Sequence, residues 1–334
     1  MTLTPSRPIA ATAEAIEQGA GRLIAGELVV FPTETVYGLG ADAAQPQAVA
    51  AVYRLKGRPA DHPLIVHTAD TDRARLWAQW NETAEQLAQA FWPGALTLIL
   101  PRAARAPDAA CGGQPTIGLR VPSHPVAQAL LQDFHRLGGL GLAAPSANRF
   151  GRVSPTMARH VQDDLGADAP MILDGGPCGV GLESTIVDLS RAQPALLRPG
   201  GVAVAEIEAV LGTGLMTGGA GAPRVSGTLA AHYAPGRPLE LWAGDQLVDR
   251  LNELTARGLR VAVWSAMRPA SPHGYWLERS MDPIEVGQRL FADLRALDAS
   301  GVDVILVEEP PDSPAWLAVR DRLGRAAVGA GRFD

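Results

Sequence analysis

The first two hundred residues alternate short apolar runs with segments whose apolar residues recur every three or four positions. Several of the runs are continuously apolar, as buried strands covered on both faces are. We predict a mixed sheet, because runs 95–100 and 116–121 lack a clear crossover helix between them. The predicted strands are residues 28–31, 64–67, 95–100, 116–121, 141–144, 171–173 and 185–189. The predicted helices are residues 12–18, 47–55, 82–91, 125–134 and 155–165, the last with Ser154 as its cap and Pro155 in its first turn.

The composition changes near residue 212, where glycine and proline become frequent. A segment of this length and composition is unusual inside one compact domain, so residues 212–237 are predicted to be a linker or a lid. Beyond it, apolar runs alternate with helical patterns in the manner of a doubly wound domain. The predicted strands there are 239–242, 260–264 and 302–307, and the helices are 246–256, 283–298 and 314–324. We expect an α/β domain over residues 1–211 and a smaller Rossmann-like α/β domain over residues 238–334.

Charge and cysteine content exclude several classes of protein. The net charge of −6 over 334 residues disfavours a large, non-specific surface for nucleic acid. Cys111 and Cys178 are too few for a disulfide framework or a four-ligand zinc site, so we expect two idle or buried thiols. The seven histidines lack the spacing of metal ligands. No apolar run is long enough for a membrane span or a signal peptide, and a cytoplasmic location is the expectation.

Residues 31–40, FPTETVYGLG, are the most informative segment. Three hydroxyl groups follow a predicted strand and precede an expected helical segment, and they can bind a small polar ligand. Gly38 and Gly40 allow backbone N–H groups to approach that ligand closely. Residues 38–43 also fit a dinucleotide-binding pattern, but weakly, because they lie seven residues past the strand. Taken alone, the segment is also compatible with an ordinary turn.

Two cations, Lys56 and Arg58, follow the predicted helix 47–55 and suit a polyanion approached from two directions. The helix macrodipole would also attract cations to this end, so the pattern alone leaves both explanations open. His62 follows at once, and His67 ends an apolar strand, where α/β proteins place ligands. Together these residues favour a phosphate site.

Arg120 lies within an apolar strand and therefore requires an anionic partner. An internal salt bridge and a ligand carboxylate are both open at this point. Ser146 and Asn148 follow another apolar run, either as ligand-binding groups or as a plain turn. Residues 181–185 form a further loop with hydroxyls, and Arg198 lies near another strand end.

The order of these motifs resembles the YrdC-like domain of threonylcarbamoyl-AMP synthases over about residues 13–211. The C-terminal domain and residues 232–235, HYAP, resemble the long, two-domain form of that family. The segments that carry the resemblance are PTETVYGLGADA, KGRP, HPLIVH, FWPGALTLIL, TIGLRVP, APSAN, SPT, LESTIVDL and LLRPG.

The resemblance implies a YrdC-like twisted mixed sheet and an enzyme that joins L-threonine, bicarbonate or CO2, and ATP. The products would be L-threonylcarbamoyl-adenylate and pyrophosphate, and the adenylate serves the modification of an adenosine beside the tRNA anticodon. By resemblance, the threonine pocket consists of Thr35, His67, Arg120, Ala144 and Ser184. The ATP ligands are Arg58, His62, Thr116, Ser146, Ser154, Arg198 and Tyr233. Lys56 and Asn148 complete a catalytic tetrad with Arg58 and Ser146.

The same resemblance implies Mg²⁺ held mainly by the ATP phosphates, with no prosthetic group and no protein ligand to a metal. The expected partners are ATP, L-threonine, bicarbonate and the downstream threonylcarbamoyl-transferase proteins that modify tRNA, with no membrane partner. One departure concerns residues 228–231, TLAA, where family members often carry basic residues. Arg224 or Arg237 are the candidates to replace them. We further hypothesise that residues 218–235 close over the site as a lid, with Tyr233 reaching the nucleotide.

Two other functions were weighed against this one. A carbamoyltransferase of the hydrogenase-maturation type contains a similar domain but requires zinc-binding cysteines and an acylphosphatase-like module. An RNA-binding or ribosome-assembly factor would use a cation-lined concave site. The acidic balance and the absence of aromatic residues interleaved with basic ones count against it, so no strong direct tRNA binding is expected.

Overall fold

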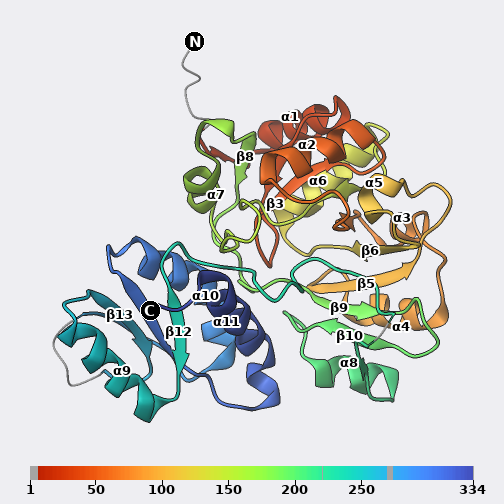
Figure 1. Ribbon diagram of the computed structural model, residues 1–334. Helices are drawn as coiled ribbons and strands as arrows, with labels where there is room; N and C mark the ends of the chain where they lie inside the picture. Colours follow the sequence, from red (N-terminus) through yellow and green to blue (C-terminus); the bar gives the residue numbers. More distant parts are fainter. Residues whose placement is uncertain (1–6, 220, 269–273, 334) are drawn as a thin grey trace. The chain divides into compact units, whose positions relative to one another are not determined.

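The computed structural model describes residues 7–219, 221–268 and 274–333, and the chain forms two compact units (Figure 1). The first unit comprises Met1–Phe150 and Ser154–Thr228, and the second comprises Gly151–Val153 and Leu229–Asp334. The segment 212–237 that we predicted as a linker is therefore divided between the two units at residue 228. Each unit is described by itself below.

The first unit contains an eleven-stranded mixed sheet in the order β1-β8-β2-β3-β7-β4-β6-β5-β9-β10-β11. Its strands are β1 (Ile9–Ala10), β2 (Val29–Phe31), β3 (Gly38–Asp42), β4 (Ile65–His67), β5 (Leu96–Pro101), β6 (Thr116–Arg120), β7 (Leu142–Ala143), β8 (Met171–Asp174), β9 (Thr185–Asp188), β10 (Ala195–Arg198) and β11 (Met216–Thr217). Its helices are α1 (Ala13–Ile24), α2 (Pro46–Lys56), α3 (Thr71–Arg75), α4 (Glu82–Phe91), α5 (Asp108–Cys111), α6 (Pro125–Arg136), α7 (Ala158–Leu165) and α8 (Val204–Leu211), with a 3-10 turn η1 (Gly166–Asp168).

Both faces of this sheet are covered, which explains the continuously apolar strands. In β2, Val29 and Phe31 belong to a core shared with α1 and α6, whereas Val30 belongs to a second core that includes residues of α2, α4 and α7. In β8, Leu173 lies in the first core and Ile172 in the second. Because successive side chains of a strand point to opposite faces, every position of such a strand must be apolar.

The expected mixed sheet is present, and it contains one strand that the sequence analysis did not predict. The mixed sheet is confirmed, since β5 pairs antiparallel with β6 and parallel with β9. The helix expected at residues 47–55 is confirmed as α2. Strand β3, Gly38–Asp42, which pairs antiparallel with β2, was not predicted. A Cβ on Gly40 would lie 2.8 Å from a ring carbon of Phe31. The packing of the hairpin is therefore sufficient to require glycine at this position.

The helix start predicted at Ser154-Pro155 is wrong. Helix α7 begins at Ala158, with Met157 as its N-cap and no side-chain capping bond. Long-range bonds hold the preceding residues in a different conformation. The Ser154 hydroxyl donates to Glu183 Oε1 at 2.6 Å, and the carbonyl of Pro155 accepts from Tyr37 N at 2.9 Å. These tertiary contacts outweigh the local capping preference.

The second unit is built on four parallel strands in the order β12-β15-β13-β14. On one face, Leu247, Leu251 and Leu254 of α9 pack against β13 and β15, while α10 and α11 contact one another and α11 contacts β12. This is the doubly wound pattern that the sequence predicts, with one strand, β14, that it missed. The elements are β12 (Leu239–Trp242), α9 (Gly244–Ala256), β13 (Val261–Ser265), β14 (Tyr275–Glu278), α10 (Pro283–Ala299), β15 (Val304–Glu308), the 3-10 turn η2 (Pro314–Trp316) and α11 (Leu317–Ala330).

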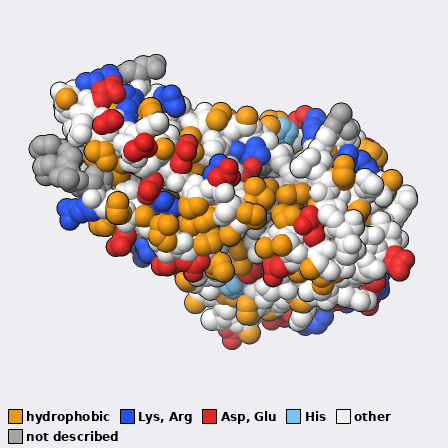
Figure 2. Space-filling view, turned by 90° about the horizontal axis from the view of Figure 1, so that it is seen from below, with side chains coloured by type: hydrophobic (Ala, Val, Ile, Leu, Met, Phe, Trp, Pro, Cys, Tyr) orange, Lys and Arg blue, Asp and Glu red, His pale blue; other side chains and the backbone are white. Residues whose placement is uncertain are grey.

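None of the helices within the described residues is long and apolar enough to cross a membrane. On the face drawn in Figure 2, basic and acidic side chains are interspersed and do not gather into a large area of one sign. That face agrees with the expectation, from the net charge, that no broad basic surface is present.

Candidate active site

The predicted site residues of the first unit follow the ends of neighbouring strands. His67 ends β4 and Arg120 ends β6, and the two residues are register partners in the parallel pair β4–β6. Leu142 of β7 is the antiparallel partner of His67. Ala144, two residues on, donates its N–H to Ile65 O at 3.0 Å. Its Cβ is close to Gly38, since a Cβ added to that glycine would lie 3.4 Å from it. The sheet thus places three of the five residues assigned to threonine on neighbouring strands, His67 on β4, Arg120 on β6 and Ala144 directly after β7.

Arg120 is buried and is held by three hydrogen bonds. Its Nε donates to Gly94 O at 3.1 Å, Nη1 donates to Thr35 Oγ1 at 2.9 Å, and Nη2 donates to Glu34 Oε1 at 2.6 Å. The second oxygen of Glu34 accepts from Ser123 N at 3.0 Å. A guanidinium has five N–H groups, so one N–H on each terminal nitrogen remains for a ligand. Of the two alternatives that the sequence left open, the internal salt bridge is present. It leaves N–H groups of the guanidinium that can still bind a ligand carboxylate.

Burial and the charge of Arg120 together determine the protonation states of Glu34 and His67. Burial raises the pKa of the Glu34 carboxyl, but the charge and hydrogen bond of Arg120 outweigh burial, so the pKa lies below its usual value. Burial, and secondarily Arg120, lower the pKa of His67 to about 3. Near neutral pH this corner therefore contains a carboxylate, a guanidinium and an uncharged imidazole.

The Thr33–Val36 turn is fixed by its own hydroxyls. Thr33 Oγ1 donates to Val36 O at 2.7 Å and lies 2.8 Å from Thr35 Oγ1, while the N–H groups of Thr35 and Val36 donate to Thr33 Oγ1 at 3.2 Å. The turn is therefore ordered by local bonds and directs Thr35 at Arg120.

Ser184 connects the two groups of predicted ligands. Its hydroxyl lies 2.7 Å from Thr97 Oγ1 and accepts from Arg198 Nη2 at 3.2 Å. Arg198 also donates to the carbonyl of Ser184, from Nη2 at 2.8 Å and from Nε at 3.2 Å. Thr97 belongs to β5, the antiparallel neighbour of β6 that carries Arg120. Ser184 thus lies between the residues assigned to threonine and an arginine assigned to ATP.

Lys56 has a different environment from the one its motif suggested. The side chain is buried, and its ammonium donates to Ser146 O at 2.5 Å and to Asn148 O. Burial, and then the charge of Arg58, lower the pKa of Lys56 well below its usual value. Two of the three N–H groups of the ammonium thus hold the loop that carries Ser146 and Asn148. A direct contact of Lys56 with a polyanion stays a prediction.

Arg58 and Arg198 are both bonded to Ser226, in the glycine- and proline-rich segment. Arg58 Nη2 donates to Ser226 Oγ at 2.9 Å and to Pro63 O at 3.1 Å, and Arg198 Nη1 donates to Ser226 O at 2.8 Å. Ser226 Oγ in turn donates to Pro63 O at 3.1 Å. Arg224, a candidate for the missing basic residues, is paired with Asp61 at 3.0 Å. The segment preceding residue 228 therefore occupies two arginines assigned to ATP.

The remaining predicted ATP residues fall into three places. His62 meets the ring of Phe150 edge-on at 5.5 Å between centroids, and the Arg58 guanidinium lies 5.7 Å from the same ring. Thr116 lines a small cavity of about 10 Å³ whose wall includes Ser226. Ser154 donates to Glu183, as described above.

Tyr233, the last predicted ATP residue, belongs to the second unit. Its ring stacks on Phe291 at 5.4 Å, and the Arg322 guanidinium lies 5.2 Å from its centroid. Tyr233 has a positive φ of 60°, a conformation that is uncommon for a residue with a side chain. Arg237 of the same unit donates its backbone N–H to Asp298 Oδ1 at 2.9 Å. A role of Tyr233 at the nucleotide remains a prediction.

The environment of the two cysteines agrees with the expectation of buried thiols. Cys111 and Cys178 are free and buried, and burial raises the pKa of Cys178 to about 12. Within residues 7–219, 221–268 and 274–333, no group of three or more His, Cys, Asp or Glu side chains could hold a metal ion.

Three residues of this site escaped the sequence analysis. Glu34 had a detectable signal, because a buried Arg120 requires an acid and Glu34 is the acid within residues 31–40. Glu183 lies inside the quoted LEST motif, but nothing in the sequence links it to Ser154. No feature of the sequence identifies Ser226 as a site residue, since its partners Arg58 and Arg198 are distant in the chain.

The chain matches two protein families in succession. Residues 22–200 match the family described as "Telomere recombination", and residues 202–328 match the family described as "Threonylcarbamoyl-AMP synthase, C-terminal domain". Among proteins, the chain is 40% identical to a threonylcarbamoyl-AMP synthase of Bacillus subtilis, over 94% of this chain and 93% of the other. It is 37% identical to one of Schizosaccharomyces pombe, over 96% and 90% of the two chains.

A solved structure agrees with these matches. The crystal structure of Sua5 from Pyrococcus abyssi, complexed with L-threonine, covers 96% of each chain with a TM-score of 0.87 and 36% identity. Matches of this extent and identity, over both units, show that the chain belongs to the threonylcarbamoyl-AMP synthase family.

Proposed function

We propose that this protein forms L-threonylcarbamoyl-adenylate from L-threonine, bicarbonate or CO2, and ATP, and releases pyrophosphate. The observation that carries the proposal is the buried Arg120, which keeps one N–H on each terminal nitrogen next to Thr35 and His67. Two further arginines, Arg58 and Arg198, share Ser226, and Arg198 is bonded to Ser184. Such a site suits a carboxylate ligand beside a polyanion. The names of the relatives and the L-threonine in the Pyrococcus abyssi structure support the same substrate.

The threonine pocket in this proposal uses Thr35, His67, Arg120, Ala144 and Ser184. The carboxylate of threonine takes the two remaining N–H groups of Arg120, since a planar fork matches a carboxylate in a bidentate way. The uncharged His67 and the hydroxyls of Thr35 and Ser184 suit the amine and hydroxyl of the substrate. Glu34 holds the guanidinium in place but is not assigned a contact with the substrate.

The ATP site in this proposal uses Arg58, His62, Thr116, Ser146, Ser154, Arg198 and Tyr233. Arg58 and Arg198 provide charge for the phosphates, provided that Ser226 gives up its bonds to them. Lys56 acts indirectly, by fixing the loop that presents Ser146 and Asn148. Mg²⁺ carried by phosphate oxygens and water would add further charge neutralisation, and no residue of this chain is assigned to it.

The chemistry requires positioning and charge neutralisation more than a protein nucleophile. The amine of threonine attacks the carbon of CO2 and loses a proton, which gives a carbamate. A carbamate oxygen then attacks the α-phosphorus of ATP, the bond from that phosphorus to the bridging oxygen breaks, and pyrophosphate leaves. Holding the two anions together against their repulsion is the contribution expected from the arginines.

The test of the proposal is pyrophosphate release from ATP with threonine and bicarbonate each omitted in turn. We expect release only when both are present. ADP and phosphate formed in water alone, at the rate of the complete mixture, would contradict the assignment.

Segment 218–235 is proposed to act as a lid over the bound adenylate, a mixed anhydride that water hydrolyses readily. The bonds of Ser226 to Arg58 and Arg198 support contact between part of this segment and the ATP site. Limited proteolysis near Gly219 should slow when ATP and threonine bind. A chain truncated after Leu211 should keep weak activity and lose the adenylate to solvent. Equal cleavage with and without ligands, together with full activity of the truncated chain, would reduce the segment to a tether.

The adenylate is proposed to pass to downstream threonylcarbamoyl-transferase proteins that modify tRNA. Direct binding of tRNA by this protein is expected to be weak, given the net charge of −6. Measuring tRNA binding over a range of salt concentrations tests this. Tight and steeply salt-dependent binding would favour an RNA-binding role instead.

A further inference from the structure

A second pocket of the first unit lies at the start of strands β2 and β8. Its volume is about 440 Å³, and its wall includes Leu28, which precedes β2, and Met171, which begins β8. These two strands are parallel neighbours. The turn at Thr33–Val36 follows the far end of β2, so the pocket and this turn of the candidate site lie at opposite ends of that strand.

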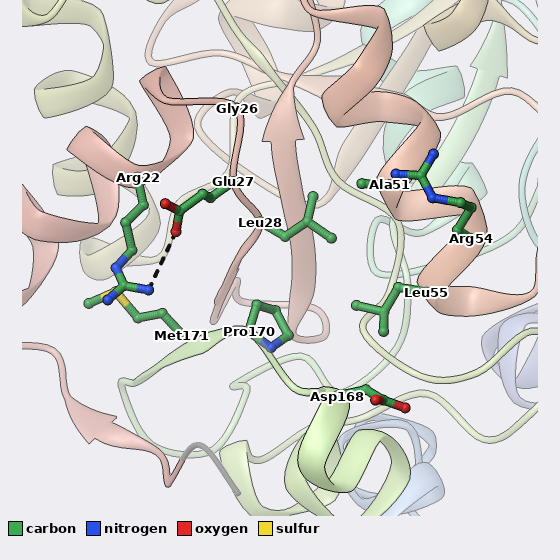
Figure 3. Close-up of a pocket in the computed structure, with 10 residues that line it drawn as sticks. All are labelled: Arg22, Gly26, Glu27, Leu28, Ala51, Arg54, Leu55, Asp168, Pro170 and Met171. Carbon is green, nitrogen blue, oxygen red and sulfur yellow. Dashed lines mark ion pairs between the residues drawn. The ribbon is translucent and has the colours of Figure 1, made fainter. Parts of the chain in front are cut away.

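The pocket has an apolar floor between charged sides (Figure 3). Leu28, Leu55 and Pro170 point toward its middle, and the ion pair of Arg22 with Glu27 lies on one side, with Arg54 on the other. The floor offers apolar surface to a ligand of moderate size, while the sides offer charges for a polar group.

The charges of the pocket are unequally compensated. Arg22 pairs with Glu27 at 3.5 Å, and Asp168 pairs with Arg149, also at 3.5 Å. Among the described residues, the side chain of Arg54 makes no hydrogen bond or ion pair. The exposed guanidinium of Arg54 is therefore the uncompensated charge of this pocket, and a ligand with one negative group complements it.

The wall that carries Arg54 is also connected to the candidate active site. Arg54 and Leu55 belong to the last turn of α2, and the next residue, Lys56, donates to Ser146 O and Asn148 O. The backbone then turns through Gly57, which has a φ of 63°, and Arg58 N donates to Tyr53 O at 3.0 Å. One helical turn thus faces the pocket with Arg54 and Leu55, and through Lys56 it supports the loop that carries Ser146 and Asn148.

We propose that this pocket binds a small organic anion with an apolar or aromatic body, and that its occupancy lowers the activity of the enzyme. A ligand that holds the Arg54 guanidinium and packs on Leu55 shifts the last turn of α2. That shift weakens the hold of Lys56 on the loop that carries Ser146 and Asn148. The pocket is then an effector site whose signal travels through a single turn of helix.

The probe for the test is anilinonaphthalene sulfonate, which joins one sulfonate to an aromatic body and fluoresces when it leaves water. We expect saturable binding that a non-reactive ATP analogue, α,β-methylene-ATP, does not displace. Arg54→Ala should weaken binding roughly tenfold, the ratio expected for loss of one hydrogen bond to a charged group. Ala51→Trp should abolish it by filling the pocket. Arg136→Ala, which removes an exposed arginine on α6, is the matched control and should bind as the unaltered protein does.

The activity assay tests the second half of the proposal. The probe should lower kcat for pyrophosphate release at saturating threonine and ATP, and Arg54→Ala should need roughly ten times more probe for the same loss. Displacement of the probe by the ATP analogue, or equal binding by Arg54→Ala and Arg136→Ala, would overturn the proposed site. The apolar floor of the pocket would then be a contact surface for a protein side chain. Binding with an unchanged kcat would overturn the connection through α2.

Discussion

The arginine of the carboxylate side, Arg120, and the two arginines of the phosphate side, Arg58 and Arg198, are stabilised in different ways. Arg120 is fixed by neighbours within the first half of the unit, above all by Glu34 and Thr35, and it retains N–H groups for a ligand. Arg58 and Arg198 instead bond to Ser226, in a glycine- and proline-rich segment. The carboxylate side is therefore preorganised, whereas the phosphate side must exchange a protein partner for its ligand. Preorganisation lowers the cost of binding, and exchange allows the site to respond to the ligand.

The largest expected effect comes from removing the cation on the preorganised side. Arg120→Met leaves the buried carboxylate of Glu34 without its partner, which should lower the free energy of unfolding by about 3–5 kcal/mol. Urea denaturation measures this loss. The double variant Glu34→Gln/Arg120→Met should recover part of the stability, because no charge is then left unpaired. Identical denaturation of the single and double variants would show that the ion pair is not what holds this corner.

A smaller loss is expected when the charge is kept and the fork is removed. Arg120→Lys should weaken threonine binding by about 1.5–3 kcal/mol, because an ammonium cannot make the bidentate contact. Calorimetric titration with threonine measures the loss, and titration with α,β-methylene-ATP is the control. Unchanged threonine affinity with weakened affinity for the nucleotide would mean that the two pockets are assigned the wrong way round.

The charge of Glu34 also predicts how stability depends on pH. Its pKa in the folded protein lies below the usual value of 4.5. The stabilisation from this group is therefore complete above about pH 4.5 and is lost as the pH falls through the lowered folded value, with a slope of at most about 1.4 kcal/mol per pH unit. Urea midpoints measured on both sides of pH 4.5 test this. Glu34→Gln should show a shallower decline, and an equal decline in both proteins would assign the acid sensitivity to other groups.

The smallest effect is expected on the phosphate side. Ser226→Ala removes an acceptor for Arg58 and should leave the ATP analogue bound equally or up to about 1 kcal/mol more tightly. Thr228→Ala is the control within the same segment, since the Thr228 hydroxyl donates to Val225 O. Weaker binding of the analogue by Ser226→Ala alone would mean that the serine helps to bind the nucleotide and does not compete with it.

The sequence predicted those parts of the fold that depend on local pattern. Both α/β units and the mixed sheet follow from periodicity and from the spacing of strands. The errors occur where distant residues decide the local conformation. Ser154 has the residue type of a helix cap but bonds to Glu183, and Gly40 has the type of a ligand loop but packs under Phe31.

The candidate site shows the same limit at the level of single side chains. Residue types and their order were sufficient to select Arg120, Arg58 and Arg198. They were not sufficient to show which groups these arginines contact, because Glu34 and Ser226 become neighbours only through the folding of the sheet and of the later segment. Lys56 is the clearest example, since its motif does not reveal that its amine is bonded to the loop that carries Ser146 and Asn148.

The burial of Lys56 has a chemical consequence for a protein that makes an activated acyl group. It is the single lysine of the chain, and its amine donates to two backbone carbonyls inside the protein. Mixed anhydrides acylate primary amines, and the protein exposes no lysine amine with which such a product can react. The remaining cations are arginines, whose guanidinium groups stay protonated and are poor nucleophiles. The surface of the enzyme is therefore inert, in its basic side chains, toward the bond that the enzyme is proposed to form.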